Sequence, residues 1–361
     1  MFRKKCKIME KKELLPLIDR LVSGENVSRE EWKALLTLQG YEEKALLAER
    51  ARSVAQHYFG NGVFVRGLVE ISSFCRNNCY YCGLRAANRL AARYRLTKEE
   101  ILACCREGDA LGFNTFVLQG GEDVQQNDEF ITSVVAAIHR EFPAKAITLS
   151  VGERSREAYA AFRNAGAARY LLRHETATPA HYSHLHPAAM DFESRTASLR
   201  ALKELGYQVG SGMMVGSPGQ TLDNLVDDIL LLESMEPQMI GIGPFIPAAN
   251  TPFAGENPGS VELTLLLLSI LRLRFPRALI PATTALATLL PDGVEQGVLA
   301  GANVVMPNLS PLAVRAKYSI YNNKKSSGSE SAQQLAQLQE RLRAIGYCID
   351  YSRGDYPAQS E

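Results

Sequence analysis

"VFVRGLVEISSFCRNNCYYCG", residues 63–83, joins a strand-forming run to three closely spaced cysteines. Residues 63–72 are rich in β-branched and other apolar side chains, which predicts a strand that is covered on both faces. Similar runs recur along the chain and are separated by helical patterns; they span residues 115–119, 146–151, 169–175, 208–215, 239–246, 279–284 and 303–307. Eight buried strands that alternate with helices predict a complete α/β barrel of the (β/α)8 TIM type.

An open, doubly wound sheet is the competing fold, but its glycine-rich dinucleotide fingerprint does not follow the first strand. We expect a helical extension over residues 1–60, since residues 8–59 have helical periodicity, and the barrel over residues 61–321. Residues 322–361 are predicted to form a polar linker, "NNKKSSGSES", and an amphipathic helix that stops at Gly346.

Helix starts are visible at two threonines. Thr97 is followed by Glu100, which is the spacing of a capping box, and a second helix is predicted to begin at Thr221. The carboxyl ends of all eight strands lie on one rim of such a barrel, and active sites are built there. We therefore expect the cysteine run and the loop "QGGED" to share that rim.

Composition excludes several classes of protein. The net charge of +1 argues against a nucleic-acid surface. The basic residues near position 5 are not followed by the apolar core of a signal peptide, and the most apolar stretch, Leu263 to Leu271, is too short to cross a membrane. We expect a cytoplasmic monomer with reduced cysteines. Four scattered cysteines are expected to be inert and receive no role: Cys6, Cys104, Cys105 and Cys348.

The remaining cysteines, Cys75, Cys79 and Cys82, form a group that invites comparison with metal sites. A structural zinc site needs four ligands, and no fourth Cys or His stands at the spacing of a zinc knuckle. An iron–sulfur cluster tolerates three thiolates and then keeps one iron open. That open iron is a place where a ligand can bind.

The spacing Cys75-x3-Cys79-x2-Cys82, with Tyr81 directly before the last cysteine, resembles the signature of the radical S-adenosylmethionine (SAM) enzymes. The resemblance implies one 4Fe-4S cluster, a SAM molecule chelated by the open iron, reductive cleavage of SAM and anaerobic chemistry. Gly120 and Gly121 of "QGGED" resemble the SAM-binding motif of that family, and Glu122 and Tyr81 are expected to contact the cofactor.

Charged residues are predicted to face the barrel interior. Alternate residues of a strand share a face, which groups Arg169, Leu171, Arg173 and Glu175. Buried charges must be paired or bind a charged ligand, so a structural ion-pair network is the alternative to a ligand site. Arg66 on the first strand is also predicted to face the barrel interior. We expect Arg66 and Arg169 to bind an anionic substrate at a deeper level of the barrel than Arg173 and Glu175.

Longer motifs, among them "RYLLRHETATP", "MVGSPGQT" and "GIGPFIPAANTPFA", resemble the HydE-type maturases of iron-only (FeFe) hydrogenase between about residues 35 and 322. The resemblance implies an enzyme of H-cluster assembly that attacks the sulfur of a cysteine-bound iron carbonyl cyanide fragment. It places SAM contacts on Gly121, Arg173, Glu175, Arg195 and Tyr318. It places substrate contacts on Arg66, Gln119, Thr148, Arg169, Thr283, Thr284 and Tyr321.

The resemblance also implies partners and alternatives. Other hydrogenase maturases and an electron donor such as a flavodoxin or ferredoxin are the expected partners. Some relatives carry a second cysteine triad after the last strand, and the corresponding residues here contain none, so we expect a single cluster. A lysine mutase like 3-methylornithine synthase, biotin synthase, and a non-catalytic iron–sulfur or zinc scaffold are the competing functions. Neither the substrate nor the choice between maturase and mutase follows from the sequence.

Overall fold

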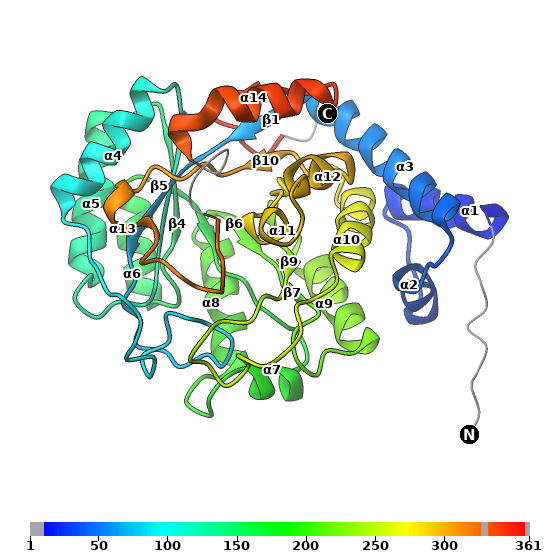
Figure 1. Ribbon diagram of the computed structural model, residues 1–361, viewed down its shortest axis with the longest axis horizontal. Helices are drawn as coiled ribbons and strands as arrows, with labels where there is room; N and C mark the ends of the chain where they lie inside the picture. The colour runs from blue at the N-terminus through cyan, green and yellow to red at the C-terminus, as the bar shows by residue number, and fades with distance from the viewer. Residues whose placement is uncertain (1–10, 326–330, 358–361) are drawn as a thin grey trace.

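A computed structural model describes residues 11–325 and 331–357. Its first helices form an extension on the right of Figure 1: α1 (Lys11–Ser23), α2 (Arg29–Leu36) and α3 (Tyr41–Phe59). The predicted helical pattern is confirmed from residue 11 onward, while residues 8–10 and Cys6 lie outside the described part. Helix α3 packs on α10 (Val261–Arg274), so the extension contacts the wall of the barrel.

The first strand of the barrel forms where it was predicted, as β1 (Gly62–Val65) and β2 (Gly67–Ser72). A parallel sheet follows with the order β2-β3-β4-β5-β6-β8. Its other strands are β3 (Thr115–Gly120), β4 (Ala146–Ser150), β5 (Ala167–Leu171), β6 (Gln208–Ser211) and β8 (Met239–Ile240). The short strands β7 (Met214–Val215) and β9 (Gly243–Pro244) pair with each other and prolong β6 and β8.

The sheet closes on itself. Parallel bridges join Met239 to Leu279 and Pro281 to Val304, and β10 (Val304–Val305) pairs with β1. A further bridge between Leu68 and Asn308 completes the circle, which confirms the TIM-type barrel. The segment predicted as a strand over residues 279–284 is present only as bridges. Pro281 has no N–H for a ladder, and Thr283 already serves as the N-cap of the next helix, α11.

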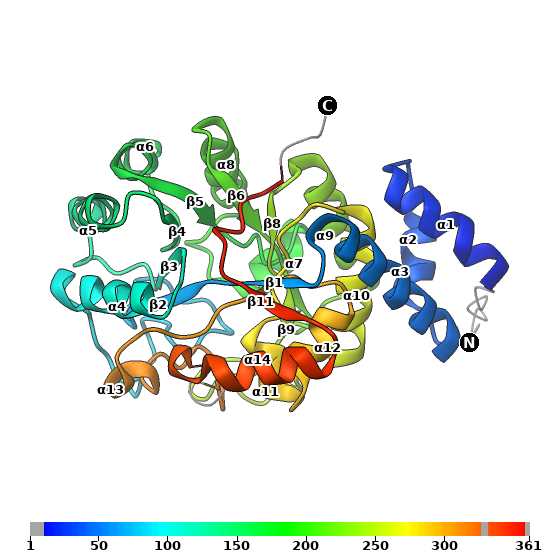
Figure 2. The ribbon, with the colours of Figure 1, turned by 90° about the horizontal axis from the view of Figure 1, so that it is seen from above.

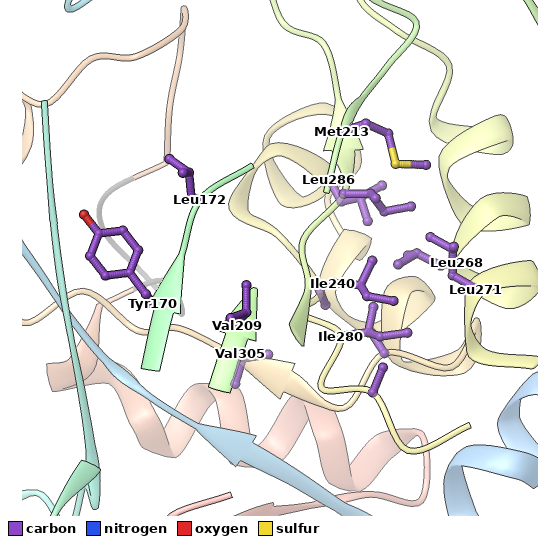
Figure 3. Packing of buried hydrophobic residues seen from close by; sticks show 14 of the residues in the cluster. Tyr170, Leu172, Val209, Met213, Ile240, Leu268, Leu271, Ile280, Leu286 and Val305 are labelled. Carbon is purple, nitrogen blue, oxygen red and sulfur yellow. The ribbon is translucent and has the colours of Figure 1, made fainter. Parts of the chain in front are cut away.

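Helices cover the outside of the barrel (Figures 1 and 2). In the close view of Figure 3, Ile240 and Ile280 of the wall face Leu268 and Leu271 of α10, and all four are fully buried. The remaining helices are α4 (Lys98–Ala110), α5 (Asp128–Glu141), α6 (Arg156–Ala165), α7 (Pro179–Leu185), α8 (Phe192–Glu204), α9 (Leu222–Met235), α11 (Thr284–Leu289), α12 (Gly293–Leu299), α13 (Leu312–Arg315) and α14 (Leu335–Ala344). The capping box at Thr97 and the helix start at Thr221 are both confirmed.

The last strand was not predicted. After α14, which ends before Gly346 as expected, the chain forms β11 (Cys348–Asp350) and pairs in parallel with β1, with Gly62 opposite Cys348. Figure 2 shows this red segment running beside β1 and then toward β6. Residues 353–356 contact Thr115 and Gln208, the first residues of β3 and β6, so this segment lies at the amino-terminal end of the strands, which we call the base of the barrel. Helix α7 and the loop after β2 lie at the opposite end (Figure 1).

Candidate active site

The three grouped cysteines lie in the loop that follows β2, at the carboxyl end of the first barrel strand. All three are free and half-buried. Backbone hydrogen bonds fix the loop, since the Cys82 amide donates to the Cys79 carbonyl at 3.4 Å and the Tyr80 amide donates to the Leu185 carbonyl at 2.9 Å. The loop thus presents three sulfur atoms from a backbone that the neighbouring helix α7 helps to hold.

These thiols are partly buried, and both arginines and carboxylates lie near them. Burial raises the pKa of each thiol, and it raises the pKa of Cys82 to about 12. The negative forms of Cys82 and Cys75 raise the pKa of Cys79 further, whereas the charge of Arg195 lowers it. The sulfur atoms are therefore electrostatically coupled to one another and to a cation. A metal that binds them must displace the thiol protons.

Tyr81 packs behind the cysteines. Its hydroxyl lies 3.2 Å from His186 Nε2, and the two rings meet edge to face. On the other side, Met190 Sδ lies 3.7 Å from Cys79 Sγ. These contacts fix the orientation of the ring before the last cysteine. The predicted contact between Tyr81 and a cofactor stays a prediction.

The "QGGED" loop after β3 lies against the cysteine loop. A Cβ atom on Gly121 would lie 2.2 Å from the Phe74 carbonyl oxygen and 2.7 Å from Cys75 Cβ, so only glycine allows this approach. A Cβ atom on Gly120 would meet Ile71 at 3.1 Å. Glu122 is buried, and its carboxylate accepts from Arg76 at 3.1 Å and from the Glu153 amide at 2.9 Å. The Glu122 carboxylate thus links its own loop by hydrogen bonds to the loop of Arg76 and the loop of Glu153.

Three of the predicted SAM contacts come together, two in the loop after β5 and one on α8. Arg173 pairs with Glu175 at 2.8 Å, and Arg195 donates to the Arg173 carbonyl at 3.0 Å. Glu175 has a positive φ of 65°, which is a strained backbone for a residue with a side chain. Arg195 also pairs with Glu153 at 2.7 Å. Sequence reasoning did not select Glu153, although the loop "VGE" that carries it lies on the expected rim.

Further inside the barrel, several polar atoms lack partners. The hydroxyls of Thr148 and Thr283 and the Nε atom of Arg173 are buried and make no hydrogen bond to any described residue. Gln119 donates to the hydroxyl of buried Tyr318 at 3.4 Å. Thr284 begins α11, and Tyr321 is half-buried near the end of the same rim. Buried polar atoms without partners are costly, so this interior is suited to a polar ligand.

An ion pair that the sequence did not suggest also lies inside the barrel. Lys324 Nζ is 2.7 Å from Glu70 Oε1, and the two side chains are 8% and 0% exposed. Asn308 donates to the other carboxylate oxygen at 2.9 Å, and Lys324 lies over the ring of Tyr318 at 5.5 Å. The sequence predicts that Lys324 belongs to a polar linker. Its position could not be predicted, because two adjacent lysines in a polar run give no sign that one of them is buried.

The deepest predicted substrate contacts have partners within the chain. Arg169 is fully buried and pairs with Asp355 at 2.6 Å, and it also donates to the Arg353 carbonyl. Arg66 donates weakly to Met239 Sδ at 3.2 Å and to the Gly354 carbonyl at 3.4 Å. These contacts favour the structural ion pair that the sequence left open as the alternative. A substrate role for either arginine stays a prediction.

The residues at the rim fit a 4Fe-4S cluster held by three thiolates. The donor atoms are all cysteine sulfur, the usual protein ligand of iron–sulfur clusters, and the charge of Arg195 would oppose the negative charge that such a cluster brings. In the described residues, no three or more His, Cys, Asp or Glu side chains have the spacing that holds a single metal ion.

A separate finding concerns membranes: across residues 11–325 and 331–357, no helix is both long and apolar enough to span one.

Comparison with known proteins agrees with this geometry. Residues 69–232 match the model of the radical SAM superfamily. The FeFe hydrogenase maturase subunit HydE of Thermotoga maritima is 43% identical over 316 residues, which cover 88% of this chain and 89% of that protein. The 3-methylornithine synthase of Methanosarcina acetivorans is 31% identical over 83% of this chain and 85% of that protein. The crystal structure of methylornithine synthase (PylB) superposes with a TM-score of 0.82 and 28% identity, covering 92% of this chain and 97% of that one.

Proposed function

The chain belongs to the radical SAM superfamily, within the family of the hydrogenase maturase HydE, and from this premise we propose its reaction and the roles of its residues. It is a radical SAM enzyme of FeFe hydrogenase maturation. We propose that it acts on a small anionic substrate, a cysteine-bound iron carbonyl cyanide fragment, and that the attack falls on the substrate sulfur. The observation that carries the proposal is the thiol triad on the barrel rim, coupled to the cation of Arg195.

Cys75, Cys79 and Cys82 would hold the 4Fe-4S cluster, and Gly121 would let SAM approach it closely. When bound, the cluster and SAM would supply one-electron reductive cleavage of SAM to a 5'-deoxyadenosyl radical. Arg195 and Arg173 would hold the carboxylate of SAM, and Glu175 would accept from its amino group; the contacts of Arg195 and Glu175 with Arg173 support this assignment. Tyr318 closes the interior beside Gln119, which limits water around a reactive radical.

The substrate would lie below SAM, where Thr148 and Thr283 offer hydroxyls that no described residue uses. Gln119 lies one level above Thr148, since the strand register places Gln119 opposite Glu70 and Val117 opposite Thr148. Lys324 adds a positive charge close to this level, although Glu70 neutralises it. We propose that an anionic fragment binds here by hydrogen bonds from neutral donors, with Lys324 as the nearest cation.

A cell-free assay that activates apo-hydrogenase tests the maturase function. The chain with Cys79→Ala should support no activation above the omission control, because a two-thiolate site cannot hold the cluster in place. The matched control is Cys348→Ala, which removes an exposed thiol at the base of the barrel and should activate normally. Full activation with Cys79→Ala would contradict the maturase function.

A lysine mutase is the second candidate, and the TM-score of 0.82 to methylornithine synthase favours keeping it. That enzyme class handles a zwitterionic amino acid, so its SAM cleavage should depend on added lysine. Measurement of 5'-deoxyadenosine with and without lysine separates the two functions. If reduced, cluster-loaded protein forms no 5'-deoxyadenosine under any condition, the scaffold interpretation replaces both.

A further inference from the structure

The loop that carries the cysteines continues into a surface segment, residues 83–93, for which the proposed reaction has no use. Arg93 connects the segment to the thiols. Its guanidinium donates to the carbonyls of Leu84, Arg85 and Asn88 at 2.9, 2.8 and 3.1 Å. Arg93 also donates to the carbonyl of Ser73, which precedes Cys75 by two positions, and Leu84 follows Cys82 by two positions. One arginine therefore connects the backbone on both sides of the cysteine run to the surface segment.

This part of the chain has an uneven charge. Residues 73–98 contain six basic side chains and no acidic one, whereas the whole chain has a net charge of only +1. Two of the six are neutralised from elsewhere, because Arg76 pairs with Glu122 and Arg95 pairs with Asp123. No carboxylate in the described residues forms an ion pair with the arginines of the 83–93 segment. These arginines are Arg85, Arg89 and Arg93.

The same segment exposes an apolar centre. Leu90 is 79% exposed, and Ala86, Ala87 and Ala92 around it are exposed as well. A groove of about 170 Å³ adjoins Leu90, and residues from three loops line it, within the ranges 83–92, 248–250 and 316–322. Lys317 is the charged residue of that lining, which contains no acidic side chain. An exposed leucine with a basic rim is a surface suited to a protein partner of opposite charge.

This surface directly follows the cysteine loop in the chain, so a partner bound there would lie close to the thiols. We propose that the basic face, defined by Arg85, Arg89, Leu90 and Lys317, docks a small acidic one-electron carrier of the ferredoxin class. The proposal rests on the function proposed above, in which the thiol triad holds a cluster that must be reduced. One electron leaves the reduced iron–sulfur centre of the carrier and enters the cluster of this chain, and no bond or proton moves. Small, charge-complementary interfaces are typical of such transient redox encounters.

The test uses the full chain, reconstituted without oxygen, and a reduced bacterial ferredoxin as the probe. Arg89→Glu and Leu90→Glu should each slow the ferredoxin-driven reduction of the cluster by about fivefold or more at low salt, followed by stopped-flow absorbance. Binding of the ferredoxin, measured by biolayer interferometry, should weaken in parallel and become less sensitive to salt. Arg343→Glu is the matched charge reversal, on α14 near the base, and should change neither rate nor binding.

Dithionite separates this proposal from the proposed function. With dithionite, which needs no docking surface, the two face variants should cleave SAM as fast as the unmodified chain. If no form of the chain cleaves SAM with dithionite, the proposed function fails. If SAM is cleaved but both face variants accept electrons from ferredoxin and bind it as well as Arg343→Glu does, the docking proposal is wrong. If the two face variants still bind ferredoxin normally but no longer bind another hydrogenase maturase, the docking proposal is also wrong, and the face belongs to that partner.

Discussion

At the scale of single residues, the buried charges show what sequence patterns can and cannot establish. Alternation predicted that Arg169 and Tyr170 lie on opposite faces of the strand, and Arg169 is buried inside the chain while Tyr170 packs on Tyr159 of α6 at a ring distance of 5.1 Å. The same alternation cannot place Arg173, because β5 ends at Leu171. The pattern could not identify the partner of Arg169, because Asp355 follows it by nearly two hundred positions. Composition gives no information about a contact that depends on how the rest of the chain folds back.

The pair of Arg169 and Asp355 leads to a prediction about pH. Partial burial raises the pKa of Asp355, but the hydrogen bond and charge of Arg169 outweigh it, so the pKa lies below its ordinary value. A lowered carboxyl pKa contributes stability above the unfolded-state pKa, and that stability is lost as the pH falls through the folded-state pKa. Asp355→Asn should therefore lower the free energy of unfolding at pH 7 by about 1–2 kcal/mol, a value reduced for the exposure of Asp355.

Urea unfolding of both proteins at several pH values measures this effect. The gap between them should close in acid, below the ordinary range of carboxyl pKa values. A gap that persists unchanged at low pH would mean that Asp355 acts by packing and not by charge.

The buried pair of Glu70 and Lys324 should behave as a coupled unit. Lys324→Met leaves a buried carboxylate with Asn308 as its remaining side-chain partner, and should destabilise the fold by about 3 kcal/mol. Combining it with Glu70→Gln should cost clearly less than the sum of the two single changes, since the double variant contains no unpaired charge. Chemical denaturation of the four proteins gives the coupling energy. Simple additivity would show that the two side chains do not interact in solution.

At the scale of elements, helix starts were predicted correctly where neighbouring residues form a clear capping motif. The capping box at Thr97 is present, with the Thr97 hydroxyl accepting from the Glu100 amide at 3.2 Å and Glu100 accepting from the Thr97 amide at 2.7 Å. By contrast, β11 could not be predicted. It is three residues long, and its pairing with β1 depends on a partner that lies near the other end of the chain.

Helix α4 begins at Lys98, 16 residues after Cys82 in the same connection, so its cap can be tested for an effect on the cysteine-bearing loop. Thr97→Ala should lower the free energy of unfolding by about 1 kcal/mol through the lost cap. The visible spectrum of the reconstituted cluster should not change, because α4 does not supply a ligand. Thr97→Ser keeps the hydroxyl and should restore most of the stability. A cluster spectrum that changes with Thr97→Ala would instead mean that the cap orders the cysteines.

At the scale of the whole molecule, the alternation of strands and helices was sufficient to predict the closed barrel and the rim on which its chemistry lies. The three thiols, Gly121 and Arg195 do meet on that rim. Glu153 and Lys324 were missed because each owes its place to a loop, and the conformation of a loop is set by contacts from several elements at once.

Cofactor binding should stabilise the whole fold. A ligand that binds only the native state adds about 2.7 kcal/mol when its concentration is one hundred times its dissociation constant. For a chain of this size, that corresponds to a rise in Tm of about 2–5 °C when SAM is added to cluster-loaded protein. Differential scanning fluorimetry without oxygen measures the shift. Cys79→Ala should show no shift and Cys348→Ala should show the full shift, whereas an equal shift in both would place SAM away from the thiol triad.

The pairing of β1 between β10 and β11 has a consequence for synthesis of the protein. Residues 62–65 leave the ribosome early, yet both neighbouring strands, at residues 304–305 and 348–350, leave it late. The nascent polypeptide therefore carries unpaired edges of β1 through most of its translation. The barrel cannot close until residues 304–308 arrive, and the other edge of β1 stays unpaired until residues 348–350 arrive. Chaperone capture during elongation should accordingly persist until residue 350 has emerged, and then end abruptly.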